Sequence, residues 1–241
     1  MKQNKDTFLL VMPSFNEEGH IKQTLASVHQ IIKSVPGSEI LIVDANSTDK
    51  TAQIINNFSK KNKGITIIQK ERGGYGKDLL HGYNLALKTR HTWIFQTDSD
   101  FPFDPSDFLK LWAKRDLSPL ILGFRKRRND PFYRTILAWV IEVAILLLTR
   151  KFIKDSNIPF RLIKSDYLKR TLKKIPPATI APNIFLSILA STDGHHLQHI
   201  PVSHYSRNKS KNAGRIARGA LQGILELVLF ICKNNRTPRN S

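Results

Sequence analysis

Short apolar runs of the β type alternate with stretches of helical spacing through the first half of this chain. In the helical stretches apolar residues recur three or four positions apart, as at Ile21, Leu25 and Val28. Strand and helix repeated in this order predict an α/β fold, a mostly parallel central sheet with helices on both faces. The expected strands are 8–12, 39–43, 65–69 and 92–96, and the expected helices are 18–34, 51–60 and 77–88.

A polar cluster follows each of these four strands. The clusters are Pro13-Ser14-Phe15-Asn16-Glu17-Glu18, Asp44-Ala45-Asn46-Ser47-Thr48-Asp49, Arg72-Gly73-Gly74-Tyr75-Gly76-Lys77 and Asp98-Ser99-Asp100. In open parallel sheets, ligands bind beyond the carboxyl ends of the strands, where the strand order switches. The sequence therefore predicts one ligand crevice to which all four clusters contribute.

Asp98 and Asp100 stand one residue apart at the end of the fourth strand. Carboxylates at alternate strand positions point the same way, and they repel each other unless a cation lies between them. Mg²⁺ or Mn²⁺ suits two aspartates and usually keeps water or a substrate phosphate among its ligands. The alternative is that Asp98 caps the next helix and Asp100 is merely exposed.

The other clusters allow both a structural and a binding interpretation. Asp44 either ends a plain strand-to-helix turn or accepts a hydrogen bond from a ribose hydroxyl or a base N–H. The 73–77 loop offers backbone N–H groups and Lys77 at a helix start, which favours anions. Neither a P-loop nor GxGxxG spacing is present, which argues against a P-loop nucleotidase and a dinucleotide-binding enzyme.

The charge balance is strongly basic. The 241 residues, enough for one large domain, include 38 Lys and Arg against 19 Asp and Glu, a formal net charge of +19. Such an excess suits nucleic acid, an anionic membrane surface or phosphate-bearing substrates. No RNA-binding or zinc-finger motif occurs, so we expect no nucleic-acid partner. The lone Cys232 suits a reducing compartment, and the first apolar run, ending at Pro13, is typical of a strand and not of a signal peptide.

The second half predicts fewer strands and two strongly apolar segments. Expected here are strands at 120–124 and 196–202 and helices at 135–149, 165–173 and 183–191. The apolar segments 135–149 and 219–232 fall short of the roughly 20 residues that span a bilayer. Basic residues flank both, which favours short amphipathic helices lying in a membrane surface, the alternative being core helices beside a solvated charged face.

Taken in order, the motifs PSFNEE, VDANSTDKT, RGGYGKDLLHGYNLAL and TDSDF resemble those of family 2 glycosyltransferases of the GT-A fold. LGFRKRR, DSNIPFRLI and IPVSHYSRNKSK resemble the polyprenyl-phosphate branch, which includes dolichyl-phosphate mannose synthases. The resemblance covers roughly residues 8–215. It implies an inverting, metal-dependent hexosyltransferase that uses a UDP- or GDP-sugar and a polyprenyl phosphate acceptor, peripheral on the cytoplasmic face of a membrane.

The resemblance also implies roles for individual residues. The donor nucleotide-sugar would contact Pro13, Phe15, Asn16, Glu17, Asp44, Lys77, Asp98, Ser99, His204 and Arg207. Asp98 and Asp100 would bind Mg²⁺ or Mn²⁺. The reaction centre would be lined by Arg125, Arg134 and Arg161. Two positions depart from the family: Ala45 replaces a second acid, and Pro102 stands where some members have a third metal ligand. The metal would then have fewer protein ligands or take one from elsewhere, such as Asp104.

These observations predict a catalytic domain over 1–208, with a nucleotide-sugar half at 8–118 and an acceptor half at 119–208 that contains the interface helix 135–149. A membrane-associating helix at 209–233 and a flexible tail at 234–241 follow. An ionised lipid phosphate needs no strong base, whereas a saccharide hydroxyl does. Asp155 is the candidate base, unless it is a surface acid at a helix end. A non-catalytic basic binding module on the same fold is a further hypothesis.

Overall fold

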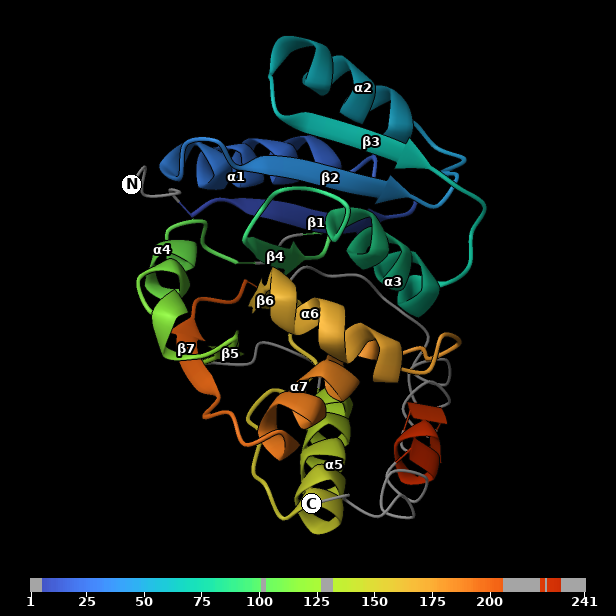
Figure 1. The fold of residues 1–241 in the computed structure, drawn as a ribbon. Helices are drawn as coiled ribbons and strands as arrows, with labels where there is room; N and C mark the ends of the chain where they lie inside the picture. The colour runs from blue at the N-terminus through green and yellow to red at the C-terminus, as the bar shows by residue number, and fades with distance from the viewer. Residues whose placement is uncertain (1–5, 101–102, 127–131, 206–221, 224, 231–241) are drawn as a thin grey trace.

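The computed structural model describes residues 6–100, 103–126, 132–205, 222–223 and 225–230, without the side chains of residues 132–134, 137 and 148. The described residues form one seven-stranded sheet with helices packed against it (Figure 1). Its strands are β1 (Phe8–Ser14), β2 (Glu39–Asp44), β3 (Ile65–Gln69), β4 (Trp93–Thr97), β5 (Leu120–Arg125), β6 (Phe160–Lys164) and β7 (Gln198–Val202).

The strand order is β3-β2-β1-β4-β6-β5-β7. β1 pairs in parallel with both β2 and β4, β2 with β3, and β5 with β7, whereas β6 runs antiparallel to β4 and β5. The order reverses between β1 and β4, where the chain returns across β1 to the other side of the sheet. This topology confirms the predicted α/β fold and puts the expected ligand crevice beyond the carboxyl ends of β1 and β4.

The helices are α1 (Ile21–Ser34), α2 (Thr51–Lys61), α3 (Tyr75–Ala86), α4 (Asp107–Trp112), α5 (Phe132–Thr149), α6 (Ser165–Thr171) and α7 (Pro182–Thr192), with short 3₁₀ helices η1 (Arg115–Leu117) and η2 (Leu172–Lys174). All of these except α4 and the 3₁₀ helices occur where the sequence predicted helices, and α5 packs against α7. Residues 222–223 and 225–230 are also helical. The rest of the expected 209–233 helix and the expected tail lie outside the described residues.

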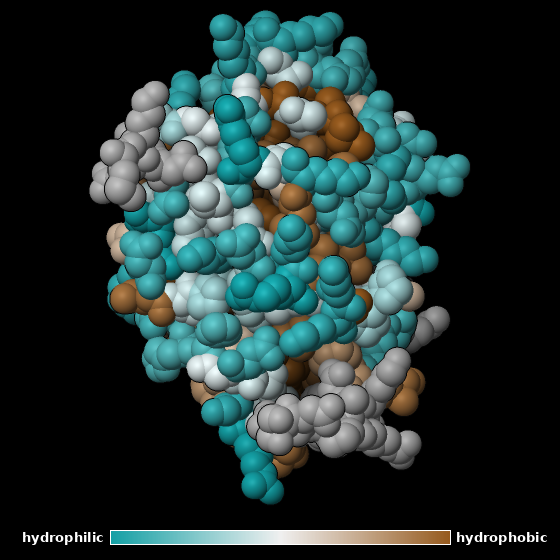
Figure 2. Space-filling model, viewed as in Figure 1, coloured by the Kyte–Doolittle hydropathy of each residue, from teal (hydrophilic) through white to brown (hydrophobic). Residues whose placement is uncertain are grey.

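Apolar burial holds these layers together. Every residue of β1 is buried, and α1 turns Ile21, Leu25 and Val28 into the core. Each such aliphatic side chain contributes about 1.5–3 kcal/mol when it leaves water. On the face seen in Figure 2, hydrophilic side chains surround patches of exposed apolar atoms.

Gly76 fixes where α3 begins relative to α7. A Cβ at this position would lie 1.9 Å from the backbone oxygen of Thr179, a contact that no side chain can make. The absence of a side chain at Gly76 therefore lets the start of α3, with the neighbouring Tyr75, approach the segment that leads into α7. This close approach joins the two halves of the sequence beside the crevice.

β6 is a strand that the sequence did not predict. It lies between β4 and β5 near the centre of the sheet, and Phe160, Leu162 and Ile163 are buried. The run is short, follows Pro159 and contains Arg161 and Lys164, so that it lacks the uninterrupted apolar pattern of a buried strand. Arg161 pairs in register with Gln96 of β4, below the end of the sheet that carries the crevice.

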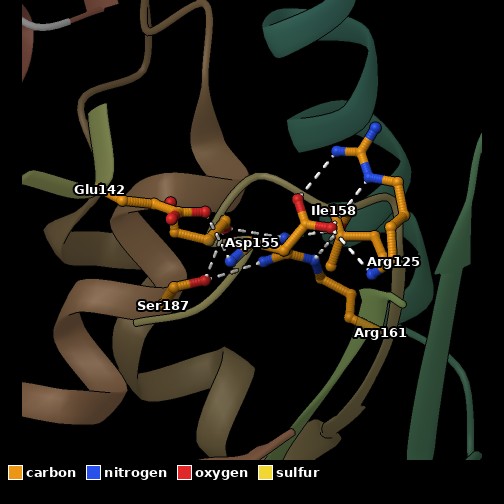
Figure 3. Close-up of polar contacts among 7 residues, drawn as sticks. Arg125, Glu142, Asp155, Ile158, Arg161 and Ser187 are labelled. Carbon is orange, nitrogen blue, oxygen red and sulfur yellow. Dashed lines mark hydrogen bonds and ion pairs between the residues drawn. The ribbon is translucent and has the colours of Figure 1, made fainter. Parts of the chain in front are cut away.

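The structure corrects the prediction that Arg161 lines the reaction centre, because the Arg161 side chain is not accessible. Its side chain is fully buried, and Figure 3 shows the guanidinium directed into the protein. The guanidinium donates to the backbone oxygens of Ile158 at 2.6 and 3.0 Å, Ser156 at 3.1 Å and Asn183 at 2.8 Å, and to Ser187 Oγ at 3.3 Å. Arg161 therefore serves as a structural cation that ties α7 to the loop before β6.

Arg161→Met should lower the free energy of unfolding by about 3 kcal/mol, because each buried carbonyl left without its donor costs about 1–3 kcal/mol. Urea denaturation measures this change, and Arg90→Met at an exposed arginine is the matched control. If Arg161→Met kept full stability but bound nucleotide more weakly, Arg161 would act in nucleotide binding, and its structural role would be excluded.

Candidate active site

A crevice of about 490 Å³ opens beyond the ends of β1 and β4. Three of the four predicted strand-end clusters contribute side chains to it, from the loops after β1, β3 and β4. The lining residues are Pro13, Ser14, Phe15, Asn16, Glu17, Arg72, Tyr75, Asp78, Asp98, Ser99 and Asp100. Residues from distant parts of the sequence thus meet at the switch point of the sheet.

The cluster after β2 supports the crevice from behind. Asp44 is fully buried, and its two carboxylate oxygens accept hydrogen bonds from Ser47 Oγ at 2.6 Å and Ser47 N at 3.0 Å. Asn16 Oδ1 accepts from Thr48 N at 2.9 Å, and Asn16 itself has a left-handed φ of 52°, which asparagine tolerates. In this structure the Asp44 carboxylate therefore closes the strand-to-helix turn after β2, and Asp44 is not among the residues that line the crevice.

One wall of the crevice is formed by the aromatic ring of Phe15, with the guanidinium of Arg72 stacked over it. The Arg72 guanidinium carbon lies 3.9 Å from the centre of the Phe15 ring. Behind it, Asp78 Oδ1 accepts from Gly73 N at 3.1 Å and from Lys70 Nζ at 2.6 Å, which holds the glycine loop in place. An aromatic ring beside a guanidinium suits a planar base and an adjacent phosphate.

Asp98 and Asp100 lie just past the end of β4, and both line the crevice. Asp98 Oδ1 accepts from Tyr75 Oη at 3.0 Å and from Gln96 Nε2 at 3.3 Å. Tyr75 as a whole is 40% exposed, but desolvation of its hydroxyl, followed by the Asp98 carboxylate, raises the pKa of Tyr75 well above its ordinary value, so the hydroxyl keeps its proton at neutral pH. The capping alternative for Asp98 is wrong, because the next helix begins only at Asp107.

The donor set of this crevice fits Mg²⁺ or Mn²⁺. Two carboxylates in one crevice are hard oxygen ligands, and within the described residues no cluster of three or more His, Cys, Asp or Glu side chains forms a metal site by itself. Water and substrate oxygens would therefore complete the shell. Asp104 does not supply a third ligand here: its Oδ1 accepts from Ser106 N at 2.9 Å and Ser106 Oγ at 2.8 Å, and these bonds lower the pKa of Asp104.

Asp155 and Arg125 form a bidentate ion pair in the second half of the chain (Figure 3). Arg125 Nε donates to Oδ2 at 2.9 Å and Nη2 donates to Oδ1 at 2.8 Å, while Glu142 Oε1 of α5 accepts from Asp155 N at 3.0 Å. Asp155 is only 4% exposed, so the hypothesis of a surface acid is wrong. With both oxygens held by Arg125, the geometry suits orienting that arginine better than removing a proton.

The remaining predicted residues are dispersed. Lys77 is exposed and lines a second hollow, together with His81 and Lys169, instead of the crevice. His204 forms an isolated β-bridge with Phe103. Arg134 belongs to α5, but its side chain is not described, and Arg207 lies outside the described residues.

Sequence reasoning did not assign a role to several residues that the crevice brings together. Asn183 Nδ2 donates to Tyr75 Oη at 3.2 Å, although Asn183 belongs to α7 in the other half of the chain. Ser14 lines the crevice, and its buried Oγ has no hydrogen-bond partner among the described residues. Arg72 and Tyr75 belong to the polar cluster after the third strand. Nothing in the sequence indicated that Arg72 lies against Phe15 or that Tyr75 bonds Asp98.

Comparisons with known proteins agree with this arrangement. Residues 9–175 match the model of glycosyl transferase family 2. The crystal structure of glucosyl-3-phosphoglycerate synthase from Mycobacterium tuberculosis with Mn²⁺, UDP-glucose and phosphoglyceric acid superposes with a TM-score of 0.69 at 15% identity, over 94% of this chain and 80% of that one.

Two curated relatives align over most of this chain. Undecaprenyl-phosphate mannosyltransferase of Micrococcus luteus is 20% identical over 225 residues, which cover 90% of this chain and 91% of the relative. Dodecaprenyl-phosphate galacturonate synthase of Rhizobium johnstonii is 26% identical over 216 residues, which cover 83% of this chain and 62% of the relative. With its sheet topology and its family match, the chain belongs to glycosyl transferase family 2 and is a glycosyltransferase of the GT-A fold.

Proposed function

We propose that this glycosyltransferase moves a hexose from a UDP- or GDP-sugar to a polyprenyl phosphate at a membrane surface, with inversion at the anomeric carbon. The observation that carries the choice of acceptor is the Arg125–Asp155 pair, in which both carboxylate oxygens are engaged by a guanidinium. A lipid phosphate is already ionised and needs cations to position it, whereas a hydroxyl acceptor needs a base. The two relatives that act on polyprenyl phosphates, by their names, support the same acceptor.

The crevice has the chemistry that a nucleotide-sugar donor requires. Phe15 and Arg72 offer a stacking surface and a positive charge, and Asp98 and Asp100 would hold Mg²⁺ or Mn²⁺. When bound, the ion neutralises charge on the leaving diphosphate. The solved M. tuberculosis enzyme, crystallised with Mn²⁺ and UDP-glucose, supports a donor and metal of this class.

The reaction is a single displacement. An oxygen of the acceptor phosphate attacks the anomeric carbon opposite the leaving group, so the new C–O bond forms as the bond to the nucleoside diphosphate breaks. The diphosphate leaves with the electron pair, and no proton has to be removed from the ionised acceptor. Arg125 and Arg134 would hold the acceptor phosphate in line, and Asp155 would fix the direction of the Arg125 guanidinium.

The end of the molecule that carries α5 suits contact with a membrane surface. Trp139 and Leu147 of α5 are 63% and 76% exposed, and Leu229 of the helical segment 225–230 is 62% exposed. Both elements lie at the same end of the molecule in Figure 1, and Arg150 and Lys151 follow α5 directly. None of the described helices is both long enough and apolar enough to cross a membrane. Peripheral attachment to the cytoplasmic face, through apolar insertion and attraction to anionic lipids, is therefore proposed.

Purified protein supplied with membrane lipid extract, Mn²⁺ or Mg²⁺, and each radiolabelled UDP- or GDP-hexose in turn should place label in an organic-soluble lipid. Mild acid should release the label, since a glycosyl phosphate is acid-labile. Asp100→Ala should reduce labelling by about 10²–10³-fold, the order of loss when a transition-state charge loses its stabilisation. Scintillation counting of the extracted lipid measures both results.

Arg134→Ala should abolish lipid labelling while it leaves metal-dependent nucleotide binding intact, and Arg90→Ala is the matched control far from the crevice. Hydrolysis of one donor without lipid label would exclude the phosphate acceptor. No reaction with any donor would contradict the proposed function as a whole.

Leu147→Ser should weaken binding to anionic phospholipid vesicles roughly tenfold, because burying one leucine contributes about 1.5–3 kcal/mol. Leu117→Ser is the control, since Leu117 of η1 is 61% exposed but lies outside α5. Vesicle co-sedimentation measures the two affinities. Equal losses for both variants would show that α5 has no special role at the membrane.

A further inference from the structure

We infer that Tyr75 and Asn183 are positioning residues that hold Asp98 in its metal-binding orientation. Through them, α7 of the acceptor half would set the affinity of the donor crevice for a divalent cation. The inference rests on the proposed function, because it requires a cation bound by Asp98 together with the nucleotide. It adds two residues to the site, one of which neither lines the crevice nor touches Asp98.

The hydrogen bonds that link Asn183, Tyr75 and Asp98 all run the same way, with Asn183 donating to Tyr75 and Tyr75 donating to Asp98. An ionised carboxylate only accepts, so the Tyr75 hydroxyl must donate its single proton to Asp98 Oδ1, at 3.0 Å. The Tyr75 oxygen then accepts from Asn183 Nδ2 at 3.2 Å and from Gln96 Nε2 at 3.4 Å. Two N–H donors at this oxygen leave the hydroxyl proton directed at Asp98.

The orientation of the Asn183 amide is also determined by its neighbours. Its Oδ1 accepts from Tyr83 Oη at 3.4 Å, so its NH₂ group faces Tyr75. Its backbone oxygen accepts from Arg161 Nη1 at 2.8 Å, which anchors the first turn of α7 on a fully buried cation. Asn183 and Tyr83 are themselves completely buried, so neither side chain has room to adopt another rotamer.

The arrangement has a consequence for metal binding. A carboxylate ligand held in one orientation loses less conformational entropy when a cation binds, and hydrogen-bonded partners of metal ligands commonly set affinity in this way. Without the Tyr75 hydroxyl, Gln96 Nε2 would remain on Asp98 Oδ1 at 3.3 Å, a weaker restraint. The affinity for metal should fall, while the rest of the crevice keeps its shape.

The test compares Tyr75→Phe with Tyr167→Phe by isothermal titration calorimetry of UDP and GDP, over a range of Mn²⁺ concentrations and in EDTA. Tyr167 is the control, because it is also a tyrosine, does not line the crevice, and its hydroxyl has no partner among the described residues. We expect Tyr75→Phe to raise the Mn²⁺ concentration for half-maximal nucleotide binding about tenfold, as expected for a lost partner of a metal ligand. Binding in EDTA and the melting temperature without metal should not change.

Asn183→Asp tests the direction of the hydrogen bonds from Asn183 through Tyr75 to Asp98, at a residue that does not contact Asp98. The substitution replaces an N–H donor by a carboxylate oxygen, which would compete with Asp98 for the Tyr75 proton, while Arg161 lies nearby as a counter-charge. We expect the Mn²⁺ concentration for half-maximal nucleotide binding to rise at least as much as for Tyr75→Phe, although residue 183 does not line the crevice.

The outcomes separate this inference from the proposed function. If both variants respond to Mn²⁺ like the wild type, the positioning role is excluded, although the proposed function stands. If Tyr75→Phe weakens binding equally with Mn²⁺ and in EDTA, Tyr75 contacts the nucleotide directly and the inference is overturned. If the wild type binds neither nucleotide with Mn²⁺, the proposed function fails and the positioning role fails with it.

Discussion

The buried guanidinium of Arg161 is the interaction on which the rest of the site depends. A cation without water is stable only when its donors are satisfied, and the acceptors here come from the loop before β6 and from the first turn of α7. Burial lowers the pKa of Arg161, while nearby Tyr83, Tyr75, Asp155 and Asp98 oppose that change. Since an arginine starts from so high a pKa, the group remains charged and fixes α7 against the sheet.

The two halves of the chain meet on this framework. β4 of the first half pairs with β6 of the second half, which aligns Gln96 with Arg161 across one rung of the sheet. Above that rung, Asn183 donates to Tyr75, and Tyr75 donates to Asp98. Elsewhere in the second half of the chain, Asp155 is paired with Arg125. Asp98, proposed to hold the metal, and Arg125, proposed to hold the acceptor, are therefore each held by hydrogen bonds from side chains that lie far from them in the sequence.

Local patterns account well for the first half of the fold. The strands β1 to β4 and the helices between them follow from apolar periodicity, because each element has one buried face that the spacing of its residues records. The same patterns failed for β6, whose buried arginine makes a central strand look like part of a loop. The family resemblance led to Arg161 and Lys77 being placed toward the substrate, since a positive charge in a motif carries no information about which way the side chain points.

The amino-acid sequence by itself determined the parallel βα alternation, the polar clusters at the strand ends, the paired aspartates and the family. These features are local in the chain, and periodicity or motif order is enough to recognise them. Only the tertiary structure decided that Asp155 holds Arg125, and that Asn183, Tyr75 and Asp98 are joined by hydrogen bonds. The physical reason is that hydrogen bonds between side chains require contact in space, and the antiparallel insertion of β6, which brings those side chains together, leaves no periodic signal in the sequence.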